Sequence, residues 1–228
     1  LARTGHTSWT LTEIDFTDGP YLSPNATSTT LTPSGTSGSV NITASASTFV
    51  STDVGRLVSF SNGRAKITGF TSATVVAATT QDDFDNTNAV TDWKLGAFSG
   101  TTGHPSCVSF FEQRLVFAGT IAEPQTLYFS KSGDYENMTT GTNADDAMVY
   151  TIASNQVNRI RYLKSVRTLL IGTTGGEFTV SADGTDAAVT PTNIVIKKQS
   201  SYGTANVDAQ PAGNSILFLQ KAKRKIRE

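Results

Sequence analysis

"SCVSFFEQRLVFAGT", residues 106–120, contains two short apolar runs separated by polar residues. Its β-branched and aromatic residues are typical of strands, and a Gly-Thr pair ends the second run. Two more strand-like segments follow, "TLYFS" (126–130) and "MVYTI" (148–152). The stretch therefore predicts the first two of four consecutive short strands.

The same order of segments then begins again. The second round comprises "RIRYLKS" (159–165), "RTLLIGTT" (167–174), "EFTVS" (177–181) and "NIVIKK" (193–198). Gly119 and Gly172 are 53 residues apart, and a third round comprises "VDAQPAG" (207–213), "SILFLQ" (215–220) and the start of "KRKIRE" (223–228). A unit of about fifty residues with four strands predicts β-propeller blades, about two and a half of them in residues 99–228. Because a propeller needs at least four blades to close, either neighbouring subunits supply the rest or the chain is a piece of a longer protein, which is the interpretation we favour.

Residues 20–98 do not follow this repeat. "SVNITAS" (39–45) and "SATVVAATT" (72–80) alternate as strands do, and "DVGRLVSFSNGRAKITGF" (53–70) predicts a hairpin with its turn at Asn62-Gly63. Five or so strands here predict a small inserted β-barrel or curled sheet. "SGTTG" (99–103) has the composition of a linker, and residues 1–19 are assigned to the propeller. The expected fold class is all-β throughout.

Composition and charge disfavour several classes of protein. The chain has 228 residues, 37% of them hydrophobic, which is enough for a substantial core. A net charge of -1 with 16% charged residues gives no broad basic surface for nucleic acid. A single cysteine excludes an internal disulfide, and no apolar run is long enough to predict a membrane segment.

Cys107 with His104 is the sharpest catalytic hypothesis, since a cysteine nucleophile needs a base or a positive neighbour. Strand alternation instead places Cys107 beside Ser109 and Phe111 on one face, which favours a buried, inert thiol. A polysaccharide depolymerase would need a pair of carboxylates, and the spacing selects none from Glu112, Glu123, Asp134 and Glu136. We therefore expect no enzyme activity.

Two further motifs are weighed as ligand sites. "DDFDNTN" offers Asp82, Asp83, Asp85 and Asn88 to calcium, but Asn88 stands where an EF-hand loop needs Gly, so a solvated loop is favoured. "GTTGGEF" lacks the Gly-Lys-Ser/Thr ending of a phosphate loop, and Gly175-Gly176 is interpreted as a hairpin turn with positive φ. No metal or cofactor is expected.

The C-terminal "KAKRKIRE" carries five positive charges and one negative charge in eight residues. Alternation along a strand would place four basic side chains on one face, a surface suited to an acidic partner or DNA. This predicted interaction surface consists of Lys221, Lys223, Lys225 and Arg227.

Several long motifs resemble the tail proteins of short-tailed phages and prophages related to the tail tubular protein B, or nozzle, group. They include "GHPSCVSFFEQRLVFAGT" (103–120), "LLIGTTGGEFTV" (169–180) and the stretch from "VTPTNIVIKKQSSYG" (189–203) to the end of the chain. The segment around "STDVGRLVSFSNGRAKITGF" (51–70) also resembles the barrel in the first catalytic cysteine half-domain of ubiquitin-activating enzymes. That second resemblance concerns a scaffold and implies no chemistry.

The phage resemblance implies a virion protein made in the bacterial cytoplasm. It implies a ring of several copies, often six in relatives, at the distal end of the tail, with DNA passing through its channel and adaptor and fibre proteins as partners. The alternative is a tail module that recognises carbohydrate on the host surface. Aromatic residues that could form a sugar-binding platform are present in the sequence, but in β-rich chains aromatic residues more often fill core or interface positions.

Overall fold

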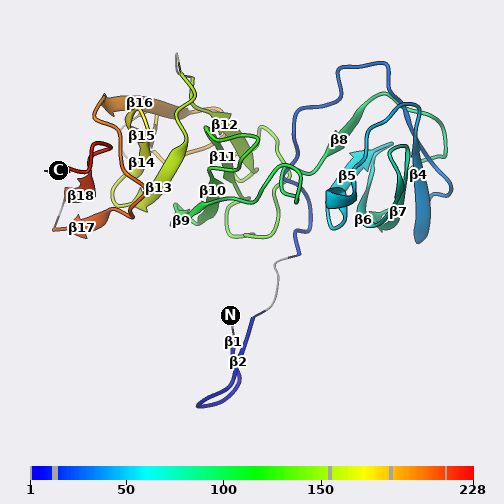
Figure 1. Ribbon diagram of the computed structural model, residues 1–228, viewed down its shortest axis with the longest axis horizontal. Coiled ribbons are helices and arrows are strands. Elements are labelled where there is room, and N and C mark those ends of the chain that lie inside the picture. Colours follow the sequence, from blue (N-terminus) through cyan, green and yellow to red (C-terminus); the bar gives the residue numbers. More distant parts are fainter. Residues whose placement is uncertain (1, 12–14, 154–155, 185–186, 214) are drawn as a thin grey trace.

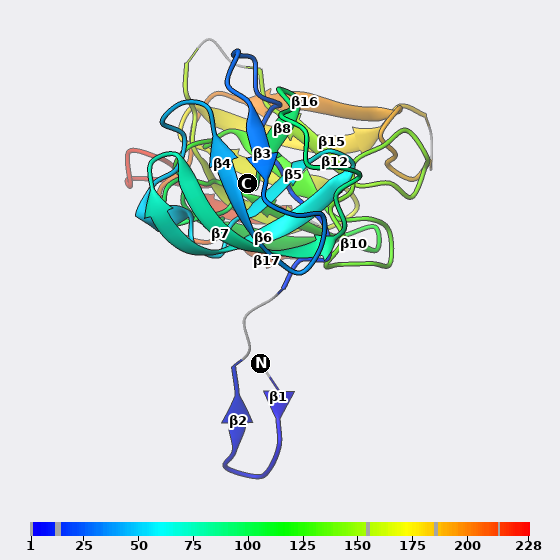
Figure 2. The ribbon, with the colours of Figure 1, turned by 90° about the vertical axis from the view of Figure 1, so that its right-hand side faces the viewer.

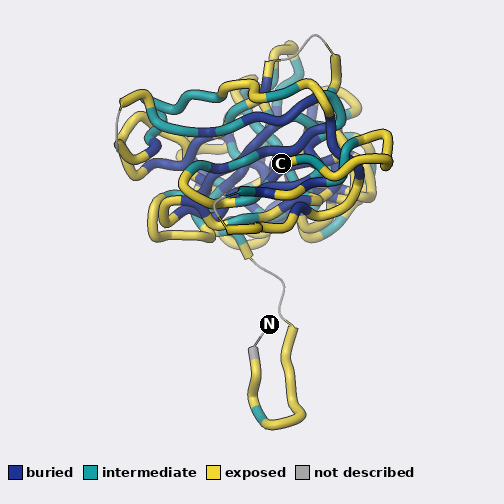
Figure 3. Tube along the Cα trace, turned by 90° about the vertical axis from the view of Figure 1, so that its left-hand side faces the viewer, coloured by how far each residue is buried: buried dark blue, intermediate teal, exposed yellow. Residues whose placement is uncertain are grey.

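The computed structural model describes residues 2–11, 15–153, 156–184, 187–213 and 215–228. It is an all-β structure, as predicted, and the described residues contain no α-helix. One 3-10 turn, η1 (Ser51–Asp53), is present. Figure 1 shows a curled sheet beside a row of stacked sheets, with a small hairpin projecting away from both. Figure 3 shows that the buried residues concentrate in the sheets and the exposed ones in the hairpin and connecting loops.

The curled sheet is a six-stranded half-barrel, seen in front in Figure 2. Its strands are β3 (Leu31–Pro33), β4 (Ser39–Ala44), β5 (Leu57–Phe60), β6 (Gly63–Ser72), β7 (Val75–Asp82) and β8 (Trp93–Leu95). Their order is β3-β4-β7-β6-β5-β8, and all pairs are antiparallel. A bridge between Leu31 and Val90 joins the β3 edge to the segment before β8. Alternate side chains of β4 point into a separate apolar core.

Two predictions about this region need correction. The β5–β6 turn consists of Ser61 and Asn62, both with positive φ, whereas Gly63 already pairs with Phe60. A Cβ on Gly63 would lie 2.6 Å from the Asp83 carbonyl oxygen, so close packing explains this glycine. Residues 99–103 are not an open linker. They form a turn in which Ser99 and Thr102 are buried and Thr102 Oγ1 donates to the Ala97 carbonyl at 2.7 Å.

Two four-stranded antiparallel sheets follow, each with its strands in chain order. The first sheet contains β9 (Cys107–Phe111), β10 (Arg114–Ala118), β11 (Thr126–Phe129) and β12 (Met148–Thr151). The second sheet contains β13 (Ile160–Ser165), β14 (Leu169–Thr173), β15 (Gly176–Ala182) and β16 (Ile194–Ser200). Each strand falls on a segment that the sequence predicts.

A third sheet and the N-terminal hairpin complete the described structure. The third sheet contains β17 (Gln210–Ala212), β18 (Ser215–Leu219) and β19 (Ile226–Arg227), and the hairpin pairs β1 (Ala2–Arg3) with β2 (Trp9–Thr10). From the segment expected to accompany the repeat, Asp18 forms a parallel bridge with Asn137 beside the first sheet.

The first and second sheets pack face to face around one apolar core. The core takes side chains from both sheets, among them Val116, Leu127, Ile160 and Ile171, each fully shielded from solvent. The opposite face of the first sheet is also covered, because Phe98, which lies outside that sheet, packs on Phe117 and Tyr128. Burial on both faces explains why β11 is buried along its whole length and shows no alternation of buried and exposed residues.

Glycines in the second sheet allow close packing and do not supply the predicted turn geometry. The β14–β15 turn lies at residues 174–175, because Thr173 pairs with Gly176, and neither Gly175 nor Gly176 has positive φ. A Cβ on Gly175 would lie 2.1 Å from Asn158 Oδ1. Gly172 pairs with Tyr162, and a Cβ there would lie 2.0 Å from Tyr162 Cε1, so the ring can occupy this place only above a glycine.

We predict that Gly172→Ala lowers the free energy of unfolding by about 1–3 kcal/mol, because the added methyl must displace the buried Tyr162 ring. Urea unfolding measures the change. The matched control is Gly69→Ala in β6, where the new Cβ would lie at an ordinary 3.6 Å from the Ala77 Cβ. Equal losses in both variants would show that the space above Gly172 is not the cause.

Candidate functional site

The predicted C-terminal basic surface does not form as expected. Lys221–Arg224 make a turn, and only Ile226–Arg227 continue as a strand. Lys223 has positive φ, and its N–H donates to the Gln220 carbonyl at 2.7 Å. The strict alternation that would align the four basic residues is therefore broken. Lys221, Lys223 and Lys225 are exposed on this turn, while the half-buried Arg227 stacks on the Tyr202 ring at 4.1 Å from its centroid.

The acidic stretch at residues 82–88 is also dispersed by the fold. Asp82 pairs with Arg64 at 3.4 Å, and Asp85 accepts a 2.6 Å hydrogen bond from Asn62. Phe84 between them is buried against Phe60 in the core of the curled sheet. Within the described ranges, no three His, Cys, Asp or Glu side chains are grouped so that they could hold a metal ion.

Cys107 occupies the buried face of β9, as the alternation predicts. Cys107 and Phe111 are buried, whereas Val108 and Phe110 are exposed on the other face. The thiol contacts the Ile160 carbonyl at 3.8 Å and Ser106 Oγ at 3.7 Å. Burial raises the pKa of the Cys107 thiol, which disfavours the thiolate that a nucleophile needs. His104 is exposed and lines a cavity elsewhere, and Cys107 is not part of that cavity.

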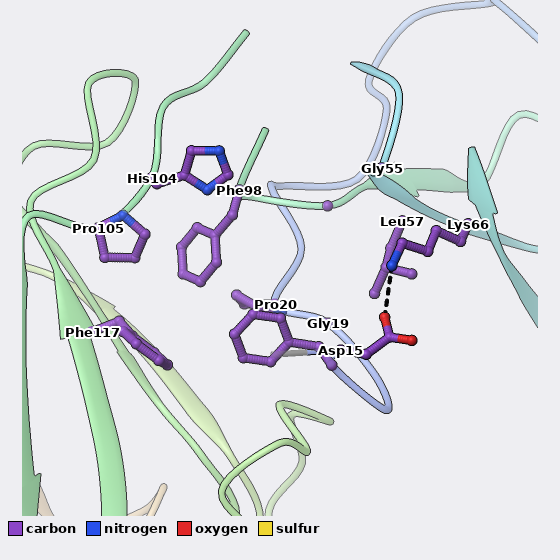
Figure 4. Close-up of a pocket in the computed structure, with 12 residues that line it drawn as sticks. Asp15, Gly19, Pro20, Gly55, Leu57, Lys66, Phe98, His104, Pro105 and Phe117 are labelled. Atoms are coloured by element: carbon purple, nitrogen blue, oxygen red, sulfur yellow. Dashed lines mark hydrogen bonds and ion pairs between the residues drawn. The ribbon is translucent and has the colours of Figure 1, made fainter. Parts of the chain in front are cut away.

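That cavity lies between the curled sheet and the first sheet (Figure 4), and its volume is about 250 Å³. Phe16, Phe98 and Phe117 meet edge to face at centroid distances of 5.8–5.9 Å. Lys66 and Asp15, on the other side, form an ion pair at 2.8 Å. Because both charges are paired and the rings contact one another, these residues join the two sheets.

Arg114 is a buried side chain that sequence reasoning did not single out. Its guanidinium donates to four carbonyl oxygens, those of Ala144 (2.5 Å), Asp146 (2.7 Å), Ser130 (2.8 Å) and Asp145 (3.3 Å). These bonds hold the long β11–β12 connection against the first sheet. An arginine at the start of an apolar strand was the available signal, because a buried guanidinium must find acceptors.

Glu177 is another buried charged residue that sequence reasoning did not single out. It lies in β15 and is 8% exposed, and Ser200 Oγ donates to its Oε2. Burial raises the pKa of the Glu177 carboxyl, although the hydrogen bond from Ser200 and the backbone N–H groups of Tyr202 and Gly203 act in the opposite direction. Its charge beside the Gly175-Gly176 turn was the signal that could have drawn attention to it.

We predict that Cys107 in the folded protein reacts with iodoacetamide at least about tenfold more slowly than in the urea-unfolded protein, because burial protects the thiol and opposes its ionisation. Mass spectrometry of the alkylated protein gives both rates. His104→Ala should leave the folded-state rate unchanged. A fast reaction that depends on His104 would instead support the hypothesis that His104 activates Cys107 as a nucleophile.

We predict that Glu177→Gln becomes progressively more stable than the wild type as pH rises above about 4, near the usual carboxyl pKa of about 4.3. The folded state binds the Glu177 proton more tightly than the unfolded state does, so ionisation at higher pH costs the wild type stability. Urea unfolding between pH 4 and pH 8 measures the difference, with the exposed Glu136→Gln as the control for loss of one charge. If the stability of Glu177→Gln relative to the wild type falls as pH rises, burial does not raise the pKa of Glu177.

The comparisons with known proteins leave the family open. Neither the protein-family models nor the curated proteins compared with the chain give a match. In the part of the chain that the structure describes, no helix is long and apolar enough to cross a lipid bilayer.

Proposed function

We propose that the stacked sheets are successive blades of a β-propeller and that the chain is a structural component of a short-tailed phage or prophage tail. In this proposal the propeller belongs to a ring of copies at the distal tail tube or nozzle, located in the virion. The ring conducts DNA and docks adaptor and fibre proteins. The chain itself carries out no catalysis.

One observation carries the proposal: a four-stranded antiparallel unit occurs twice in succession, and the two units stack face to face. The first strands of the units begin at Cys107 and Ile160, 53 residues apart, and a third unit begins at Gln210. Radial stacking of such units is the construction principle of propellers. The sequence motifs that resemble nozzle-group proteins lie on these same strands.

A conduit role also suits the energetics of the stacked sheets. Their strands are hydrogen-bonded to neighbours and their facing side chains are buried, so a wall built from them resists deformation. The net charge of -1 avoids the strong attraction that a basic channel would exert on DNA. The curled sheet, with its own core, then provides a separate surface for docking other tail proteins.

Immunogold labelling tests the proposal directly. Antibodies against this chain should label the distal end of the short tail on intact particles viewed by electron microscopy. Particles stripped of fibres should keep the label, because the proposed position is in the tube. Label confined to fibres would favour the alternative of host-surface recognition, and unlabelled particles would remove the virion role altogether.

A further inference from the structure

A second cavity lies between the second and third sheets, and its volume is about 740 Å³. That size is within the range of small-molecule sites. The rings of Tyr162, Phe178 and Phe218 line it, together with the polar side chains of Glu177, Gln199 and Glu228. The cavity therefore combines a largely apolar lining with a few polar groups, which is the usual make-up of a ligand site.

The charged side chains that line this cavity are all acidic. Glu177 and Glu228 contribute carboxyl groups, whereas no lysine or arginine is among the described residues that line the cavity. Ser215 Oγ donates to Glu228 Oε1 at 2.5 Å, and Ser200 Oγ donates to Glu177 Oε2. Glu177 Oε1 is buried and accepts no hydrogen bond of ordinary geometry from the described residues, although the backbone N–H groups of Tyr202 and Gly203 favour the charged form of this carboxyl. A buried acceptor without a donor is costly, and a ligand N–H group would remove that cost.

Aromatic rings beside carboxylates are complementary to a cation on an organic body. The edge of the cavity already contains one such contact, because Tyr202 lines the cavity and its ring binds the Arg227 guanidinium. The cavity in Figure 4 differs from this one, since its aspartate and lysine neutralise each other at 2.8 Å. The cavity in Figure 4 therefore has paired charges, whereas the cavity between the second and third sheets has acidic groups without a basic partner in its lining.

We infer that the cavity between the second and third sheets binds a small organic cation, a primary ammonium group on an apolar body, with Glu177 as its counter-ion. The ammonium group donates to the free oxygen of Glu177, and the apolar body packs among the rings of Tyr162 and Phe218. This site is independent of the proposed tail role, because it depends only on the packing of these two sheets.

Titration of the isotope-labelled full chain with benzylamine, followed by NMR, tests the inference. We expect saturable shifts for amides of residues that line the cavity, with a Kd on the order of 1 mM for so small a probe. Benzyl alcohol has the same shape without the charge and should bind at least about tenfold more weakly. Cellobiose tests a neutral sugar, and binding of cellobiose in place of benzylamine would overturn the assignment.

Variants locate the counter-ion. Glu177→Gln keeps the size of the side chain and should weaken benzylamine binding at least about tenfold, whereas Glu136→Gln on an exposed loop should not change it. Urea unfolding shows whether each variant is folded. If Glu177→Gln does not fold, Phe218→Leu tests the same cavity and should weaken benzylamine binding, because it removes a ring on which the apolar body packs. Unchanged affinity in folded Glu177→Gln, shifts away from the cavity, or no saturable shifts at all would contradict the inference.

Discussion

Face-to-face packing of the first and second sheets is the interaction on which the rest of this structure depends. Val116 and Leu127 from one sheet meet Ile160 and Ile171 from the other, all without solvent exposure. Neither sheet could bury that face alone, because an isolated sheet leaves one hydrophobic side in water. The third sheet then covers the outer face at Tyr162, and Phe16 and Phe98, from segments that flank the curled sheet, cover the outer face at Phe117.

Glycines and buried polar contacts allow the sheets to pack closely. Gly172 leaves room for the Tyr162 ring between neighbouring strands, and Gly119 lets the chain approach the Ile160 carbonyl. Arg114 donates to four carbonyl oxygens of the β11–β12 connection and so holds that connection against the first sheet. In the curled sheet, the buried ion pair between Asp53 and Arg56, at 2.9 Å, holds η1 against the strands. Each of these contacts serves packing.

The sequence predicted the positions of the strands well because strand composition and β-turn residues are local signals. It failed where non-local packing decides. The pair Asn62-Gly63 looked like the turn, yet the close approach of Asp83 requires Gly63 in the strand. The turn at Glu112-Gln113 takes positive φ without any glycine. The basic alternation ending at Arg227 predicted a strand face, but the Gln220–Lys225 turn interrupts it.

The candidate ligand site was even less predictable. Glu177 and Glu228 are 51 residues apart in the chain, and they line one cavity only because the third sheet stacks on the second. Phe16 and Phe98 likewise contact Phe117 although no periodicity in the sequence connects their segments. Such contacts depend on which sheets lie next to each other. In a single sequence, the only signal for that order is the repeat of strand-forming segments.

Native-state hydrogen exchange tests the central claim, the mutual dependence of the first two sheets, most directly. Amides in β10, β14 and β15 should exchange with one common opening free energy, and the curled sheet should have a separate one, since it has its own core. If the first sheet instead opens independently while the second remains protected, their shared core does not hold the structure together.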